Sequence, residues 1–117
     1  MLPTAALLTA SVRLGGMAAN ATPHKLQALT DFGYNLGLAF QVIDDILDVT
    51  QSTEQLGKTA GKDAAVDKAT YPAILGLEKS RQEAKRLTTK ALAALKPFQK
   101  RALHLEEIAR YLLDREY

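Results

Sequence analysis

The segment 40–48, FQVIDDILD, is the feature that most limits what this chain can fold into. Wound as a helix at about 100° per residue, it places Asp48 at about 40°, Gln41 at about 60° and Asp45 at about 100° from Asp44. Tyr34 and Gly37 fall in the same arc. The rest of the circle, apart from Asn35, is apolar: Leu36, Leu38, Ala39, Phe40, Val42, Ile43, Ile46, Leu47 and Val49. One narrow polar strip therefore runs along a helix whose wide side is apolar.

An ordinary surface helix has the reverse pattern, with a wide polar face and an apolar stripe. We therefore expect this helix to be buried, with its polar strip facing a cavity. Carboxylates in such a place lose hydration and repel one another unless a cation compensates them. No Lys or Arg lies between Ala28 and Gly57. Hard divalent cations such as Mg²⁺ bind carboxylate and phosphate oxygens together, so we predict a Mg²⁺ site. The alternative is a solvated acidic face without function.

Composition narrows the class of protein. The 117 residues are enough for one domain, and a hydrophobic content of 47% can fill a core. A net charge of +2 excludes the broad basic field that nucleic acid needs. There is no cysteine, and we find no apolar run long enough to span a bilayer. Arg13 follows the first apolar stretch, the opposite order to a signal peptide, so we expect a cytoplasmic protein.

The hydrophobic periodicity predicts only helices, and the fold class expected is all-α. Four helices are predicted: 4–17, Pro23 to about Val49, Tyr71 to about Leu95, and 104–115. Pro97 is expected to end the third of them. In the last helix, Leu105, Ile108, Ala109, Leu112 and Leu113 are expected to face inward. The segment 51–70 has two glycines and three lysines, and we interpret it as a long functional loop.

Four motifs in order resemble the trans-type polyprenyl diphosphate synthases, in particular the bacterial short-chain farnesyl diphosphate synthases. FQVIDDILD resembles their second aspartate-rich motif. Leu56-Gly57-Lys58 with Gly61 and Asp63 is similar to the lysine loop that follows it. The stretch 67–73, DKATYPA, together with ILGLE, resembles the next block, and 4–8, TAALL, resembles the segment with the family's Lys-Thr pair. The resemblance covers nearly the whole chain.

Two departures from the family pattern also shape the expectation. The first aspartate-rich motif and the upstream basic residues are missing, and Pro3 stands where the family has the Lys of the Lys-Thr pair. The resemblance therefore implies that residues 1–117 are the C-terminal part of a larger helical-bundle synthase. The full-length protein is expected to be a homodimer, and the fragment alone is expected to be inactive.

The resemblance also implies a reaction, the head-to-tail condensation of isopentenyl diphosphate with an allylic diphosphate, either dimethylallyl or geranyl, to give farnesyl diphosphate. Asp44 and Asp48, with Asp45 at the edge of the arc, are expected to hold Mg²⁺ against the leaving diphosphate. Lys58 and Lys68 are expected to bind that diphosphate directly. The amide of Gln41 and the hydroxyl of Thr4 are expected to stabilise the allylic cation without trapping it.

Each assignment has a simpler alternative. Lys58 and Lys68 are ordinary exposed lysines in that reading, and Thr4 is a helix cap. Gln41 then only bonds a neighbouring carboxylate, and Asp45 pairs with a base. For the whole chain, the alternative function is a non-catalytic helical module that associates with a partner chain through its apolar surface. A terpene cyclase relative would lack the lysine block from Lys58 to Lys68.

Overall fold

The computed structural model describes residues 3–55 and 70–114, and these residues form helices without any strand. In chain order the elements are α1 (Pro3–Ala18), α2 (Pro23–Gln55), α4 (Tyr71–Leu75), α5 (Leu77–Ala93), the 3₁₀ helix η1 (Lys96–Ala102) and α6 (Leu103–Leu113). The prediction of an all-α fold is confirmed. None of the described helices is long and apolar enough to cross a membrane.

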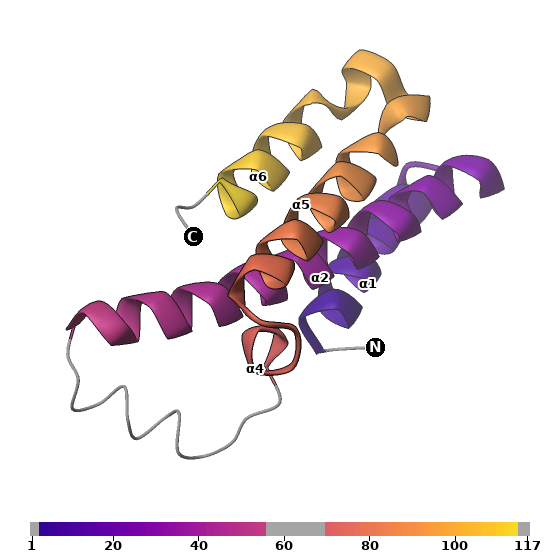
Figure 1. The fold of residues 1–117 in the computed structure, drawn as a ribbon. Coiled ribbons are helices and arrows are strands. Elements are labelled where there is room, and N and C mark those ends of the chain that lie inside the picture. The colour runs from indigo at the N-terminus through magenta and orange to yellow at the C-terminus, as the bar shows by residue number, and fades with distance from the viewer. Residues whose placement is uncertain (1–2, 56–69, 115–117) are drawn as a thin grey trace.

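The long helix α2 is the central element of the bundle (Figure 1). Its apolar side is buried as predicted: Val42, Ile43 and Ile46 are fully buried, and they pack in one core with residues of α5 and α6. Burying each of these side chains contributes about 1.5–3 kcal/mol relative to leaving it exposed. The last turns of α2 extend past α4 in Figure 1, and the helix continues to Gln55, beyond the predicted end near Val49.

Helices α1 and α2 lie side by side and approach each other at glycines (Figure 1). A Cβ atom added at Gly37 would lie 2.3 Å from the Cα atom of Ala5, and one added at Gly33 would lie 2.9 Å from the Cα atom of Thr9. Only residues without a side chain allow backbones to come this close. The turn between the two helices has Asn20 in the left-handed region, with a φ of 58°, a conformation that asparagine tolerates after a helix end.

The predicted single helix from Tyr71 to about Leu95 is wrong, because the chain breaks at Gly76. Gly76 has a φ of 85° and ψ of 162°, which a helix cannot contain, and it separates α4 from α5. The amide of Gly76 donates to the carbonyl of Pro72 (2.9 Å), and the hydroxyl of Ser80 donates to the carbonyl of Gly76 (2.7 Å). The two helices therefore keep their end groups hydrogen-bonded while the chain changes direction.

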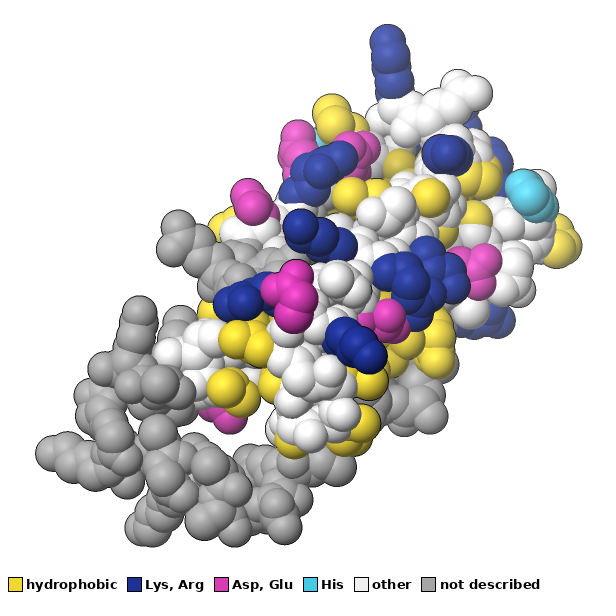
Figure 2. All heavy atoms as spheres, viewed as in Figure 1, with side chains coloured by type: hydrophobic (Ala, Val, Ile, Leu, Met, Phe, Trp, Pro, Cys, Tyr) yellow, Lys and Arg dark blue, Asp and Glu magenta, His cyan; other side chains and the backbone are white. Residues whose placement is uncertain are grey.

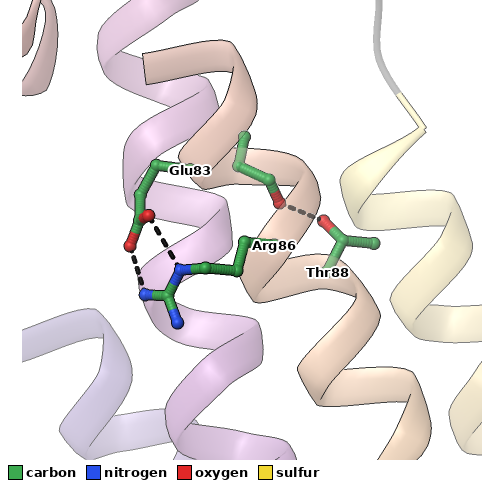
Figure 3. A network of polar contacts seen from close by, with 4 residues as sticks. Glu83, Arg86 and Thr88 are labelled. Atoms are coloured by element: carbon green, nitrogen blue, oxygen red, sulfur yellow. Dashed lines mark hydrogen bonds and ion pairs between the residues drawn. The ribbon is translucent and has the colours of Figure 1, made fainter. Parts of the chain in front are cut away.

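The charged side chains of α5 lie on its exposed or half-buried positions. Figure 2 shows Lys and Arg side chains interspersed with Asp and Glu, so that neither sign forms a separate field on this face. Glu83 and Arg86, one turn apart, form an ion pair with two hydrogen bonds (Figure 3). The hydrogen bond from Arg86 holds the pKa of the Glu83 carboxyl below its ordinary value. Such exposed pairs contribute little to stability.

The C-terminal part contains a 3₁₀ helix that was not predicted, and one residue of α6 that was expected to face inward is exposed. Helix α5 ends at Ala93, ahead of Pro97 as expected, and η1 with a kink at Gln99 leads into α6. Ala109 and Leu113 are buried, whereas Ile108, expected to face inward, is 54% exposed. The inward stripe of α6 is therefore narrower than its apolar composition indicates.

Candidate functional site

The predicted polar strip on α2 divides into two parts with different surroundings. At its upstream end, Gly37 is buried against Ala5 of α1, while Tyr34 is 39% exposed. At its downstream end, Asp44 and Asp45 are half-buried and Asp48 is exposed. The expectation that the whole strip faces a cavity is therefore wrong, since Gly37 packs against α1. The carboxylates follow where that contact ends.

Asp44 and Asp48 form the part of the site that suits a cation. They are four residues apart on one helix, so their side chains project from the same face one turn apart. Carboxylate oxygens are the ligands that Mg²⁺ prefers, and Mg²⁺ is commonly held by one or two carboxylates together with water and substrate phosphates. The two residues present fit that mode of binding, which requires no cage made entirely of protein groups.

Asp45 has a different environment from its neighbour. Its Oδ1 accepts a hydrogen bond from the Nε2 of Gln41 (2.9 Å), and its Oδ2 accepts one from the backbone N–H of Tyr71 (3.3 Å). Within the described residues, no group of three or more His, Cys, Asp or Glu side chains is placed to hold a metal ion. The three aspartates therefore do not form one cluster.

Gln41 and Thr4, the two residues expected beside the allylic cation, lie in the same region. Ala5, next to Thr4, contacts Gly37, one helical turn before Gln41. Thr4 is half-buried, and because α1 begins at Pro3, Thr4 lies inside the helix and is not its cap. Gln41 donates to Asp45, which is the simpler role that the sequence left open. The lysines expected to bind diphosphate, Lys58 and Lys68, lie outside the described residues.

Tyr71 is the residue that sequence reasoning missed. Its ring packs against the core, and burial, followed by the negative charges of Glu83 and Asp45, raises the pKa of its phenol above the ordinary value. Tyr71 is 26 residues from Asp45 along the chain, so no local pattern could have paired them.

A separate hollow of about 420 Å³ lies between α5 and α6. None of the predicted site residues lines it. The residues that do are Lys85, Thr88, Thr89, Leu92, Arg110, Leu113 and Asp114.

Comparison with known proteins connects this arrangement to a family. Residues 2–111 match the family model described as polyprenyl synthetase. The chain belongs to the polyprenyl synthetase family. This confirms the resemblance stated from the four motifs.

Two curated relatives in the polyprenyl synthetase family are much longer than this chain. It is 45% identical over 114 residues to a dimethylallyltranstransferase of Fischerella ambigua, covering 97% of this chain and 33% of that protein. It is 49% identical over 114 residues to a chloroplastic geranylgeranyl pyrophosphate synthase of Capsicum annuum, covering 97% of this chain and 31% of that protein. The chain thus spans about a third of the length of these relatives.

Solved structures agree with the family assignment. A proposed farnesyl-diphosphate synthase from Marinomonas sp. MED121 superposes with a TM-score of 0.77 at 34% identity, over 94% of this chain and 36% of that one. A geranyltransferase from Helicobacter pylori gives 0.65 at 32% identity, over 95% of this chain and 35% of that one. The helical arrangement described above is therefore part of an isoprenoid synthase fold.

Proposed function

We propose that this chain supplies the metal- and diphosphate-binding part of a prenyltransferase, which joins isopentenyl diphosphate to an allylic diphosphate such as dimethylallyl or geranyl diphosphate. The observation that carries the proposal is the pair Asp44 and Asp48 on one face of α2, at the point where the contact with α1 ends. Family membership supports it, because relatives are named for such reactions. The homodimer expected of the full-length protein belongs to the same proposal.

In this proposal, Asp44 and Asp48 hold Mg²⁺ against the leaving diphosphate, where the ion supplies Lewis-acid charge as the allylic carbon–oxygen bond breaks. Lys58 and Lys68 add positive charge to the same diphosphate. Lys68 precedes Tyr71 by three residues in the sequence, and the N–H of Tyr71 is bonded to Asp45. The chain therefore returns to the described bundle beside the acidic motif, which supports placing a basic residue there.

Gln41 and Thr4 are proposed to stabilise the positive charge of the allylic fragment. Because the Nε2 of Gln41 is engaged by Asp45, the electron-rich Oε1 is the end of this amide that remains for a cation. An amide oxygen and a hydroxyl offer dipoles at low nucleophilicity, which limits capture of the cation. Farnesyl diphosphate is the product proposed from the motifs, and geranylgeranyl diphosphate, named for several relatives, is the competing product.

The proposal predicts that the chain works only when the rest of a synthase is present. Its 117 residues hold one aspartate-rich motif, and one such motif cannot bind both diphosphates. We expect no condensation by the isolated chain. We expect prenyl products from a graft in which this chain replaces the matching third of the Fischerella relative. Radiolabelled isopentenyl diphosphate, incubated with dimethylallyl or geranyl diphosphate, measures both activity and product length.

Two results would contradict this prediction. One is condensation by the pure isolated chain. The other is a grafted synthase that folds, as judged by its helical circular dichroism and its elution volume, but forms no product. The unmodified Fischerella protein, purified in the same way, is the control.

A second function, association with a partner chain without catalysis, is favoured by α1. This helix carries one charge, Arg13, and is apolar on two opposite faces. Ala5, Thr9 and Gly16 are buried against α2, while Leu7, Leu14 and Met17 are 69%, 66% and 50% exposed on the other side. A helix that is apolar all round is normally buried on all sides. Sedimentation of the chain at several concentrations measures such association, and only the graft assay tests catalysis.

A further inference from the structure

We propose that the connection between α5 and α6 is a docking surface for an anionic lipid bilayer. It consists of the 3₁₀ helix η1 and the first two residues of α6, and we call residues 96–104 the basic turn. Figure 1 shows the connection as the orange ribbon between α5 and α6, at the end of the bundle opposite α4. The proposal does not rest on the proposed function, because no residue of the acidic motif takes part in it.

The basic turn lies in a long stretch of sequence that has cations but no anions. Residues 84–105 contain six Lys or Arg residues and no Asp or Glu. Three of these cations, Lys96, Lys100 and Arg101, fall within six consecutive positions of η1. All three side chains are exposed. The positive charge is therefore concentrated at one end of the bundle, although the net charge of the whole chain is only +2.

The acidic residues that follow in the sequence are engaged by other groups. Glu106 accepts a hydrogen bond from the Nη2 of Arg110 at 3.0 Å, and the Oε2 of Glu107 lies 3.8 Å from the Nδ1 of His104. Within residues 3–55 and 70–114, none of the ion pairs includes a Lys or Arg of the basic turn. Those three charges are therefore available to an anionic partner outside the chain.

The hydrophobic core holds the basic turn against the bundle. Leu95, just before it, is 4% exposed, and Ala102 within it is 3% exposed. Phe98 packs against the core between them, and Gln99, with a φ of 51°, forms the kink inside η1. The intervening charged side chains project outward from a segment that is attached at three points. Because such a segment is already ordered, docking costs little conformational entropy.

Exposed apolar side chains beside the cations favour a bilayer over other anionic partners. Leu103 is 53% exposed, and Pro97 is exposed next to Lys96. Apolar side chains of this kind enter the headgroup region of a bilayer, while neighbouring Lys and Arg side chains attract anionic lipids. Single-stranded nucleic acid is bound through aromatic side chains that stack on bases. The one Phe, Tyr or Trp of the basic turn, Phe98, packs against the core instead.

The test measures co-sedimentation of the 117-residue chain with lipid vesicles, made either of phosphatidylcholine alone or of phosphatidylcholine mixed with phosphatidylserine. The basic-turn variant carries three substitutions: Lys96→Gln, Lys100→Gln and Arg101→Gln. The matched control changes three cations of α5: Lys79→Gln, Arg81→Gln and Lys85→Gln. Each variant loses two Lys and one Arg, so the two have the same net charge and differ only in where the charge is removed.

We expect the unmodified chain to bind the phosphatidylserine vesicles at least about tenfold more tightly than the pure phosphatidylcholine vesicles, because each cation near an anionic bilayer strengthens binding about fivefold. The basic-turn variant should lose at least about tenfold in affinity for the anionic vesicles, and the control should stay within about threefold of the unmodified chain. Raising the salt from about 0.1 M to about 1 M shortens the screening length from about 10 Å to about 3 Å, which should abolish the preference for phosphatidylserine.

Three results would overturn the proposal. Equal losses in the two variants would assign binding to net charge and not to the basic turn. Equal binding of the unmodified chain to both lipid mixtures would assign it to the outward side of α1, where Leu7, Leu14 and Met17 are exposed. Tighter binding to a single-stranded oligonucleotide than to anionic vesicles, at equal phosphate concentration, would make nucleic acid the partner. If the basic-turn variant does not fold, Lys100→Gln and Lys85→Gln are compared in its place, and equal affinities of that pair would contradict the basic turn.

Discussion

Gly37→Ala should lower the free energy of unfolding by about 3 kcal/mol, the upper part of the range for overpacking a tight contact. The added Cβ atom would lie 2.3 Å from the Cα atom of Ala5, 2.8 Å from its Cβ atom and 2.9 Å from its backbone nitrogen. Two of these three atoms belong to the backbone, so no rotation of a side chain can make room. Helices α1 and α2 would have to move apart, which loosens the packing that begins the bundle. Urea unfolding followed by far-ultraviolet circular dichroism measures the effect.

Gly15→Ala is the matched control for that substitution. Gly15 lies in the same helix pair, and a Cβ atom added there meets nothing within 4 Å. Alanine favours the helix over glycine by up to about 1 kcal/mol, so this variant should be more stable than the unmodified chain. The opposite signs of the two effects are the expected result. Equal stability of both variants would contradict a close approach at Gly37.

These glycines also show what sequence reasoning can and cannot recover. The wide apolar side of α2 was predicted from periodicity, and Val42, Ile43 and Ile46 are indeed fully buried. The same helical wheel placed Gly37 in the polar arc, where it was assigned to a cavity. Gly33 and Gly37, four residues apart on one face, were a usable signal for a close helix contact. Whether these two glycines are buried depends on the residues that face them, Ala5 and Thr9, which belong to another helix, α1.

The sequence indicates the helix break at Gly76 less clearly than it indicates the close helix contact at Gly33 and Gly37. An isolated glycine is tolerated within a helix at a cost of about 1 kcal/mol, so ILGLE was compatible with one continuous helix. Gly76 adopts a φ of 85°, and on its N-terminal side α4 is bonded to α2 through Tyr71 and Asp45. Contacts between residues 26 positions apart leave no trace in local composition. For the same reason, residue type gives no sign that the carboxylate of Asp45 accepts hydrogen bonds from Gln41 on α2 and from Tyr71 on α4.

Asp44→Asn in the grafted Fischerella synthase should lower turnover about 100- to 1,000-fold, the loss typical when a group that stabilises developing charge is removed. Asparagine has nearly the shape of aspartate, so packing around α2 is kept while the negative charge that binds the cation is lost. In the proposed reaction the leaving diphosphate must be bound for the substrate to ionise, and a weakened metal site would slow that step. Initial rates at saturating substrate and rising Mg²⁺ concentration measure the change.

Asp31→Asn is the control for the loss of one negative charge on the same helix. Asp31 is exposed, and its carboxylate accepts a hydrogen bond from Gln27 one turn away at 3.0 Å. Losing an exposed contact of this kind costs about 0.2–0.5 kcal/mol. Turnover of the Asp31 variant should therefore equal that of the graft. Turnover of Asp44→Asn within a few-fold of that control would remove Asp44 from the metal site.

The acidic motif of α2 is proposed to hold a diphosphate through a divalent cation, and paramagnetic broadening locates such a cation directly. Mn²⁺ with inorganic pyrophosphate, added to the isotope-labelled 117-residue chain, broadens the signals of amides near the ion. We predict selective broadening between Gln41 and Val49, lost in Asp44→Asn and kept in Asp31→Asn. Broadening centred on the hollow beside Lys85 and Arg110, or equal broadening in Asp44→Asn and the unmodified chain, would contradict the account.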